Sequence, residues 1–272
     1  MKKRKLISFA DSRMQSSLRR IRQQADAMSF FDEIHTYTEL DLSAEFRHKF
    51  SHILRRGVRG YGFWVWKPAI ILHALDSLKP GDELYYLDAG CHFNPRGRAR
   101  LQEYASMLAD SKLGLAAFQL AESECNDKSF TKMDTLIHMG VQNEDALLER
   151  PQICTGHIFC VKNDRATSLL NEWMSAWDNL HLIDDSPSLA PNFPEFVEHR
   201  HDQSIFSILC KKHGALALPG SETWPPGNTR NWKQLENYPI WDKRDLGFTW
   251  HTIERLTRKL RRLSARLLPR KG

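Results

Sequence analysis

The chain has 272 residues, of which 41% are hydrophobic and 26% are charged, an ordinary composition for a soluble globular protein. No apolar run approaches the roughly 20 residues of a membrane span, and the apolar stretch Leu6–Ala10 is shorter than a signal-peptide core. We therefore expect a cytoplasmic protein. The five cysteines form no C-x-x-C pair and are odd in number, which argues against a disulfide framework and favours reduced thiols.

The net charge of +6 is concentrated at the two ends of the chain. Residues 2–5 carry +4 and residues 254–272 carry +7, which leaves −5 for the body between them. A nucleic-acid-binding protein usually has a basic body, so we expect no nucleic-acid partner. An acidic body with basic ends favours peripheral attachment to an anionic membrane surface.

The first 40 residues predict a strand, a helix and a second strand. Lys5–Ala10 is an apolar strand, and Asp11 or Ser12 is suited to cap the helix that follows. Apolar residues then recur on one helical face, and Phe30–Tyr37 reads as a strand. Such a βαβ opening predicts a parallel sheet. The residues of the helical face are Met14, Leu18, Ile21, Ala25 and Met28.

Residues 60–88 form the most informative stretch of the chain. Pro68 opens an apolar helical run, at a position where its missing N–H has no partner to lose. A turn follows, and the short strand Glu83–Leu87 leads to Asp88 and Gly90. Open α/β folds place their ligands at the carboxyl ends of such strands. We therefore expect a ligand site at Asp88.

The rest of the chain alternates helices and strands with no internal repeat, which favours a single domain over residues 1–247. Gly156, inside a late strand, indicates a bulge or a close approach of a ligand. The predicted helices are 44–54, 99–108, 131–139, 144–149, a helix capped by Asp164, and 202–213; the predicted strands are 113–120, 152–162 and 215–218; the predicted irregular segments are 122–130, 181–199 and 224–243.

Residues 248–272 predict a separate basic amphipathic helix. Its apolar residues recur at helical spacing and its arginines and lysines occupy the other faces, which is typical of helices at a membrane surface. The alternative is a helix that packs its leucines on the protein's own core. The apolar face consists of Trp250, Ile253, Leu256, Leu260, Leu263 and Leu267.

The sequence around Asp88 has three interpretations. Asp88 could cap the next helix or turn. It could bind a nucleotide sugar, with a metal or basic side chains neutralising the diphosphate and Gly90 allowing close approach of the backbone. Finally, the run from Leu87 to Cys91 resembles the start of an S-adenosylmethionine loop, but the usual Gly-x-Gly is replaced by residues 92–94, His-Phe-Asn. We rank the methyltransferase second.

A second polar cluster, residues 199–204, stands at the start of an apolar helix. Asp202 or Ser204 could be a simple N-cap. A cap does not require His201, Asp202 and Gln203 together, so the cluster could instead bind sugar hydroxyls, act as a base or ligate a metal. The histidines and cysteines lack zinc-finger spacing, which argues against structural zinc.

Three motifs in this order resemble bacterial GT-A-fold glycosyltransferase-like proteins of surface-polysaccharide and lipopolysaccharide synthesis. They are Gly60-Tyr-Gly-Phe-Trp-Val-Trp-Lys-Pro68, Gly81-Asp-Glu-Leu-Tyr-Tyr-Leu-Asp-Ala-Gly-Cys91 and His199-Arg-His-Asp-Gln-Ser-Ile-Phe206. The resemblance implies an α/β fold with a mostly parallel sheet flanked by helices, a nucleotide-diphosphate-sugar donor, and a glycan or glycolipid acceptor. The basic C-terminal helix would hold the enzyme at the inner face of the membrane. A non-catalytic protein that kept the fold is the other alternative.

The resemblance also implies roles for individual residues. Asp88 stands at the first position of the Asp-x-Asp motif that holds Mn²⁺ or Mg²⁺, whereas the second carboxylate is replaced by Gly90. Either another residue, such as His92 or Asp202, completes the metal site, or a cation such as Lys67 replaces the metal. The catalytic residues would be Asp202, Gln203 and His201, and the donor-binding residues would be Ser8, Asp11, Lys67, Asp88 and Gly90.

Overall fold

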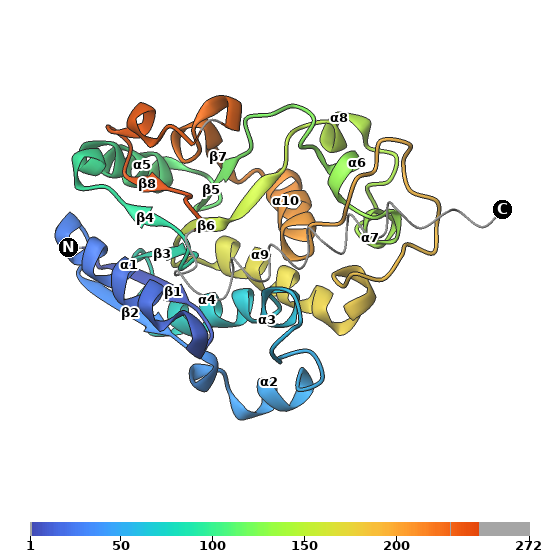
Figure 1. Cartoon of the computed structure of the whole chain (residues 1–272), viewed down its shortest axis with the longest axis horizontal. Helices are drawn as coiled ribbons and strands as arrows, with labels where there is room; N and C mark the ends of the chain where they lie inside the picture. Colours follow the sequence, from blue (N-terminus) through green and yellow to red (C-terminus); the bar gives the residue numbers. More distant parts are fainter. Residues whose placement is uncertain (1, 229, 245–272) are drawn as a thin grey trace, which may run out of the picture.

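The computed structural model describes residues 2–228 and 230–244, which are arranged around a six-stranded sheet (Figure 1). Five strands run in one direction and β6 is antiparallel to both of its neighbours, so the prediction of a mostly parallel sheet is confirmed. The strand order is β2 (Glu33–Tyr37), β1 (Arg4–Phe9), β3 (Glu83–Leu87), β6 (Ile153–Val161), β5 (Leu115–Gln119) and β7 (Leu216–Pro219).

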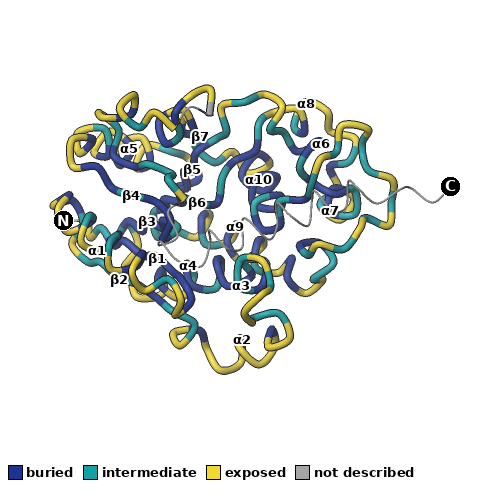
Figure 2. The backbone as a smooth tube through the Cα atoms, viewed as in Figure 1, coloured by how far each residue is buried: buried dark blue, intermediate teal, exposed yellow. Residues whose placement is uncertain are grey.

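Helices cover both faces of the sheet. Because side chains alternate along a strand, Ile7 and Tyr86 belong to one apolar core and Leu6 and Tyr85 to the other. The first core is closed by α4 (Trp66–Asp76), α9 (Asp164–Ser175) and α10 (Asp202–His213), and the second by α1 (Gln15–Met28) and α5 (Arg98–Asp110). The inner strands β1, β3 and β5 are almost entirely buried, whereas the edge strands β2 and β7 are partly exposed (Figure 2).

Side chains cap some of the helix starts, and one cap differs from the sequence prediction. Asp11 caps the short 3₁₀ turn Ser12–Met14 that precedes α1, as expected. The cap of α9 is Asn163, whose side chain accepts a hydrogen bond from the Ala166 amide, and not the predicted Asp164. Asp164 instead occupies the first turn, where a carboxylate is favourable to the helix dipole.

Several short elements escaped prediction because they are too brief for periodicity. Segment 122–130, predicted as a loop, contains α6 (Asp127–Phe130), capped by Asn126. A two-stranded sheet pairs β4 (His92–Phe93) with β8 (Ile240–Trp241). The predicted membrane helix 248–272 lies outside the described residues. Within the described part, no helix is long and apolar enough to cross a membrane. The remaining helices are α2 (Ala44–Lys49), α7 (Met133–His138) and α8 (Asp145–Leu148).

The segment α3 (Gly60–Phe63) is a turn of left-handed backbone. Five consecutive residues have positive φ: 60° at Gly60, 54° at Tyr61, 95° at Gly62, 54° at Phe63 and 60° at Trp64. Left-handed backbone costs roughly 1–2 kcal/mol per non-glycine residue, so packing must stabilise this turn. A Cβ on Gly60 would lie 2.3 Å from the Trp64 ring, so a glycine is needed there.

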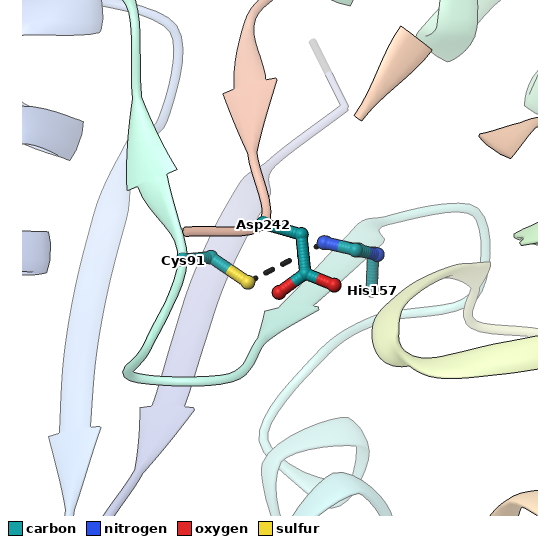
Figure 3. A group of neighbouring side chains, drawn as sticks. All are labelled: Cys91, His157 and Asp242. Atoms are coloured by element: carbon teal, nitrogen blue, oxygen red, sulfur yellow. Dashed lines mark hydrogen bonds between the residues drawn. The ribbon is translucent and has the colours of Figure 1, made fainter. Parts of the chain in front are cut away.

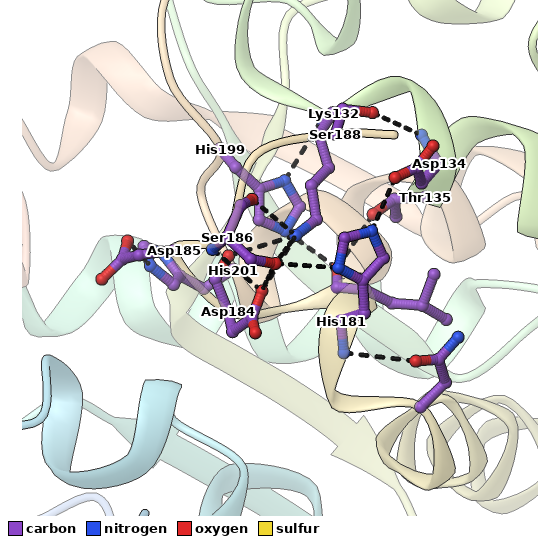
Figure 4. A network of polar contacts seen from close by, with 12 residues as sticks. Lys132, Asp134, Thr135, His181, Asp184, Asp185, Ser186, Ser188, His199 and His201 are labelled. Atoms are coloured by element: carbon purple, nitrogen blue, oxygen red, sulfur yellow. Dashed lines mark hydrogen bonds and ion pairs between the residues drawn. The ribbon is translucent and has the colours of Figure 1, made fainter. Parts of the chain in front are cut away.

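The long loop between α9 and α10 is fastened by a polar network (Figure 4). The buried Lys132 ammonium pairs with Asp184 at 3.1 Å and donates to the Ser186 carbonyl at 3.2 Å. His181 bridges Ser186 and Asp134, with Nδ1–Oγ and Nε2–Oδ2 distances of 2.8 and 2.6 Å. The predicted irregular loop is therefore ordered by side chains and not by backbone ladders.

Candidate functional site

One charged cluster lies at the carboxyl end of the central strand β3 and consists of Lys67, Asp88 and Asp202. Lys67 Nζ lies 3.2 Å from Asp88 Oδ1 and 3.2 Å from Asp202 Oδ2. The same ammonium lies 3.2 Å from the Thr155 carbonyl and 3.3 Å from its hydroxyl. Tyr86 donates its hydroxyl hydrogen to Asp88 Oδ1 at 2.5 Å. One cation thus holds two carboxylates that lie far apart in the sequence.

Exposure separates the three charged groups. The side chains of Lys67 and Asp202 are 1% and 5% exposed, whereas Asp88 is 38% exposed. Burial alone would lower the pKa of the Lys67 ammonium, but Asp202 and Asp88 outweigh this and raise its pKa above the ordinary value. Burial raises the pKa of the Asp202 carboxyl; Lys67 opposes that rise and Asp88 adds to it. Asp88 is therefore the most exposed member of the cluster.

The fold explains why these residues converge. Asp88 follows β3 directly, and its amide donates to the Gly156 carbonyl at 2.9 Å. Because β6 runs antiparallel to β3, the beginning of β6 lies at the same sheet edge, where the β5–β6 register shifts. This bulge confirms the prediction from Gly156, on which a Cβ would lie 3.5 Å from Asp88 Oδ2. Lys67 and Asp202 lie in the first turns of α4 and α10.

The turn after Asp88 is held from outside by Arg20, a residue that the sequence did not single out. Arg20 donates to the carbonyls of Ala89 and Cys91 at 2.6 and 3.3 Å. The turn continues into the strand β4 and not into a helix. A phosphate or cofactor loop of the methyltransferase kind relies on a helix N-terminus at this point, so this geometry disfavours that alternative. The carboxylate of Asp88 pairs with Lys67 and is not a helix cap.

The residues around Asp202 divide into two groups. His201, with φ of 53°, is buried, and its Nε2 lies 2.9 Å from Asp185 Oδ1. Its ring stacks on Phe63, with centroids 5.5 Å apart. The Gln203 amide donates to Gln152 Oε1 at 2.8 Å. The structure therefore places His201 against the left-handed turn and Gln203 in another polar network; their catalytic roles stay predictions.

Ser8 and Asp11 lie at the end of β1, as the sequence indicated, but neither pairs with Lys67. Ser8 is buried, and its hydroxyl has no hydrogen-bond partner within the described residues. The Asp11 carboxylate is bound by Arg13, with Nε–Oδ1 and NH2–Oδ2 distances of 2.8 and 2.6 Å. Gly90 is buried in the turn after Asp88. Donor binding by Ser8, Asp11 and Gly90 stays a prediction.

A Mn²⁺ or Mg²⁺ ion on Asp88 fits these surroundings poorly. One oxygen of Asp88 is already bound by Lys67 and Tyr86, and Gly90 contributes no carboxylate. An added divalent cation would also be repelled by the adjacent ammonium. A different group of possible ligands lies close by: Cys91, His157 and Asp242 (Figure 3), whose ligand atoms lie within 4.8 Å of one another.

The chain is similar in structure to several solved glycosyltransferases. A glycosyltransferase involved in the glycosylation of the major capsid of PBCV-1 is 11% identical and matches over 95% of this chain and 99% of that chain, with a TM-score of 0.51. Mouse xyloside xylosyltransferase 1 is 11% identical over 91% and 100% of the two chains, with a TM-score of 0.47. The galactosyltransferase LgtC is 11% identical over 87% and 86%, with a TM-score of 0.43.

No protein-family model matches the sequence, and no curated protein matches it either. The likeness therefore rests on three-dimensional structure, because a sequence identity of 11% shows only that the folds are similar. Two observations indicate the same fold. One is the central sheet with a single antiparallel strand between two helical layers, and the other is the match to the glycosyltransferase that is involved in capsid glycosylation. The fold of this chain is that of GT-A-type glycosyltransferases.

Proposed function

We propose that this protein is a glycosyltransferase that moves a sugar from a nucleotide-diphosphate sugar to a glycan or glycolipid acceptor. The observation that carries the proposal is the cluster of Lys67, Asp88 and Asp202 at the ligand-binding edge of a GT-A-type sheet. Ligands of open α/β folds bind at this edge. The three motifs that resemble surface-polysaccharide enzymes favour a hexosyltransferase that acts on a cell-surface acceptor.

Each charged group has a chemical role in the proposed reaction. The bond between the anomeric carbon and the diphosphate oxygen breaks, and a bond to the acceptor oxygen forms. Lys67 supplies positive charge against the departing diphosphate, which is the kind of stabilisation that lowers such barriers most. The exposed Asp88 binds hydroxyl groups of the donor. Asp202, whose pKa is raised by burial, orients the sugar or accepts the proton of the acceptor hydroxyl.

The proposed enzyme does not use Mn²⁺ or Mg²⁺ on Asp88, because the Lys67 ammonium already occupies the space between the two carboxylates. Activated-donor chemistry needs a positive charge near the diphosphate, and either a metal or a basic side chain meets that need. We expect Mn²⁺ and Mg²⁺ to leave donor affinity unchanged within about twofold, a difference of less than 0.5 kcal/mol.

A thermal-shift screen with uridine, guanosine and cytidine nucleotides and their sugars, with and without Mn²⁺, tests the proposal. One nucleotide class should raise the melting temperature, and the rise should vanish in Asp88→Ala. Asp76→Ala is the matched control, because Asp76 is an exposed aspartate at the opposite end of α4. Turnover of the same donor, followed as release of nucleoside diphosphate, should then fall in Asp202→Asn.

Two outcomes would contradict this function. If S-adenosylmethionine raised the melting temperature and no nucleotide did, the methyltransferase would become the favoured function. A double variant, Asp88→Ala with Asp202→Ala, that keeps the biological phenotype would point to a binding protein without catalysis.

The basic segment 248–272 supports a further part of the proposal, namely peripheral binding to the inner face of a membrane, where a glycolipid acceptor resides. Each lysine or arginine near an anionic leaflet contributes about 1 kcal/mol. Removal of residues 248–272 should release the protein from vesicles that contain phosphatidylserine, measured by sedimentation. Unchanged sedimentation would assign the segment to the protein's own core.

A further inference from the structure

A second polar centre lies beside the proposed donor site and is not needed for glycosyl transfer. Cys91, His157 and Asp242 come from three distant parts of the chain, and their ligand atoms lie within 4.8 Å of one another. Cys91 Sγ is 3.3 Å from His157 Nε2. Figure 3 shows the thiol, the ring nitrogen and the carboxylate directed toward a common point. Within the described ranges this is the only such group of three or more.

Strand pairing brings the three side chains together. His157 is paired with Leu87 in the antiparallel register of β3 and β6. Cys91 follows four residues after Leu87. The turn between them is closed by a hydrogen bond from the Cys91 amide to the Asp88 carbonyl, which keeps Cys91 close to the end of β3. The β4–β8 pair aligns His92 with Trp241, so Cys91 and Asp242 are the next residues on that ladder. The group is therefore fixed by backbone and not by chance side-chain positions.

Burial makes the group difficult to explain as ordinary packing. Cys91 and His157 are 0% and 1% exposed. Asp242 is half-buried, and Arg244 Nε lies 3.5 Å from its Oδ2. A bound cation would give the thiol, the imidazole and the carboxylate a shared partner.

We propose that Cys91, His157 and Asp242 bind a divalent transition-metal ion of the zinc class. Bonds of about 2.3 Å to sulfur and about 2.0–2.2 Å to nitrogen and oxygen require ligand atoms roughly 3.3–3.7 Å apart, close to the Cys91–His157 distance of 3.3 Å. A thiolate ligand selects against Mg²⁺ and Mn²⁺. Three protein ligands leave a fourth position for water. On binding, the Cys91 thiol releases its proton to solvent.

This ion would fasten the segment after β8 to the edge of the sheet next to Asp88. The proposal does not depend on the proposed glycosyl transfer, since neither Lys67 nor Asp202 belongs to the group. It also explains why sequence spacing failed to indicate zinc: the ligands are 66 or more residues apart, unlike the short ligand spacings of zinc fingers.

Titration of the metal-stripped full-length protein with Co²⁺ alone tests the proposal. One Co²⁺ per chain should produce a thiolate-to-cobalt charge-transfer band in the near ultraviolet, and Zn²⁺ should displace it. Cys91→Ser should abolish the band. Cys160→Ser is the matched control, because Cys160 is equally buried in β6 but lies outside the group, and it should leave the band unchanged.

Asp242→Asn guards against a folding defect, since Asp242 is only half-buried and its loss spares the core. It should keep the circular-dichroism spectrum and weaken Co²⁺ binding about 10-fold or more. The proposal is overturned if wild-type protein gives no band, if the band survives Cys91→Ser, or if Asp242→Asn binds Co²⁺ as tightly as wild type. None of these readouts depends on glycosyl transfer, so failure of one proposal leaves the other standing.

Discussion

Two buried lysine–aspartate clusters within the described residues differ in how completely their polar atoms are hydrogen-bonded. Lys211 and Asp127 are both 0% exposed, with Nζ 2.6 Å from Oδ2. Lys211 also donates to the carbonyls of Leu147 and Arg150 at 3.3 and 2.6 Å. Asp127 accepts from Gln152 and Ser207 at 2.9 and 3.1 Å. Every proton of the ammonium and both carboxylate oxygens are used, which is the pattern of a structural tie between α6 and α10.

The polar atoms of the Lys67 cluster are less completely hydrogen-bonded than those of the Lys211 cluster. Its ammonium shares three protons among four oxygens, and Asp202 Oδ2 has no hydrogen bond of good geometry within residues 2–228 and 230–244. Asp88 is partly open to solvent. Strained backbone at Phe63, Trp64 and His201 packs beside it, and such strain is typical of functional sites. The same residue types thus serve stability in one place and ligand binding in the other.

Removal of Lys211 should have the largest effect on stability. Lys211→Ala leaves the Asp127 carboxylate buried without its cation, which costs about 3–5 kcal/mol. Urea denaturation followed by circular dichroism measures this loss. Lys212→Ala is the control: Lys212 is exposed and donates to the Met139 carbonyl at 3.1 Å, so its loss should stay within about 0.5 kcal/mol. Equal losses in the two variants would remove the distinction between the clusters.

Lys67→Met should affect catalysis more than folding. Loss of one preorganised group that stabilises transition-state charge lowers kcat by about 10²–10³-fold. The loss of stability should come from Asp202, which is buried and loses its cation, and not from the exposed Asp88, which can be hydrated. Lys49→Met, which removes an exposed lysine paired with Asp178 at 2.7 Å, should change neither quantity. A Lys67→Met enzyme with normal kcat would exclude Lys67 from the reaction.

The left-handed turn can be tested with a pair of glycines. Gly60→Ala adds a clash with the Trp64 ring to the cost of a positive φ, for a total of about 2–4 kcal/mol. Gly81→Ala has a positive φ and open space around the new methyl group, so it should cost about 1–2 kcal/mol. Thermal denaturation of both variants gives the comparison. A smaller loss at Gly60 than at Gly81 would contradict the packed turn.

The anchor of the long loop should show as acid sensitivity. Burial alone would raise the pKa of Asp134, but the amides of Leu189 and Ala190 and the side chain of His181 lower it to about 2. Because the folded-state pKa is depressed, the stabilisation is present above about pH 4 and is lost as the pH falls toward 2. It amounts to about 2 kcal/mol. Asp134→Asn should abolish this part of the pH dependence in urea titrations at pH 2–5; an unchanged profile would contradict it.

Periodicity and end signals predicted the long elements well. The helical face from Leu18 to Met28 and the buried strand before Asp88 were confirmed, because amphipathic patterns and apolar runs directly report packing. The assignment of Lys67, Asp88 and Asp202 to one site followed from motif resemblance and from the rule that ligands bind at the carboxyl ends of the strands. Roles within the cluster, such as the bridge formed by Lys67, depend on side-chain geometry that no spacing encodes.

Other features lay beyond the sequence for physical reasons. The left-handed turn combines two glycines with three aromatic residues that ordinarily avoid positive φ, so only tertiary packing explains it. Gln203 bonds Gln152, a partner that the sequence could not reveal. The strands β4 and β8 have only two residues each, too few to show a periodic pattern. Their pairing could therefore not be predicted, and neither could the proximity of Cys91 and Asp242 that depends on it.

The antiparallel strand β6 has a consequence for the order in which the chain can fold. Its neighbours β3 and β5 both precede it in the sequence, and Asp202, which completes the Lys67 cluster, comes later still. A nascent chain that ends before β6 would expose the edge of β3 and leave an ammonium with half of its counter-charge. Contacts so distant in sequence slow folding, so the proposed catalytic cluster forms only after most of the polypeptide has left the ribosome.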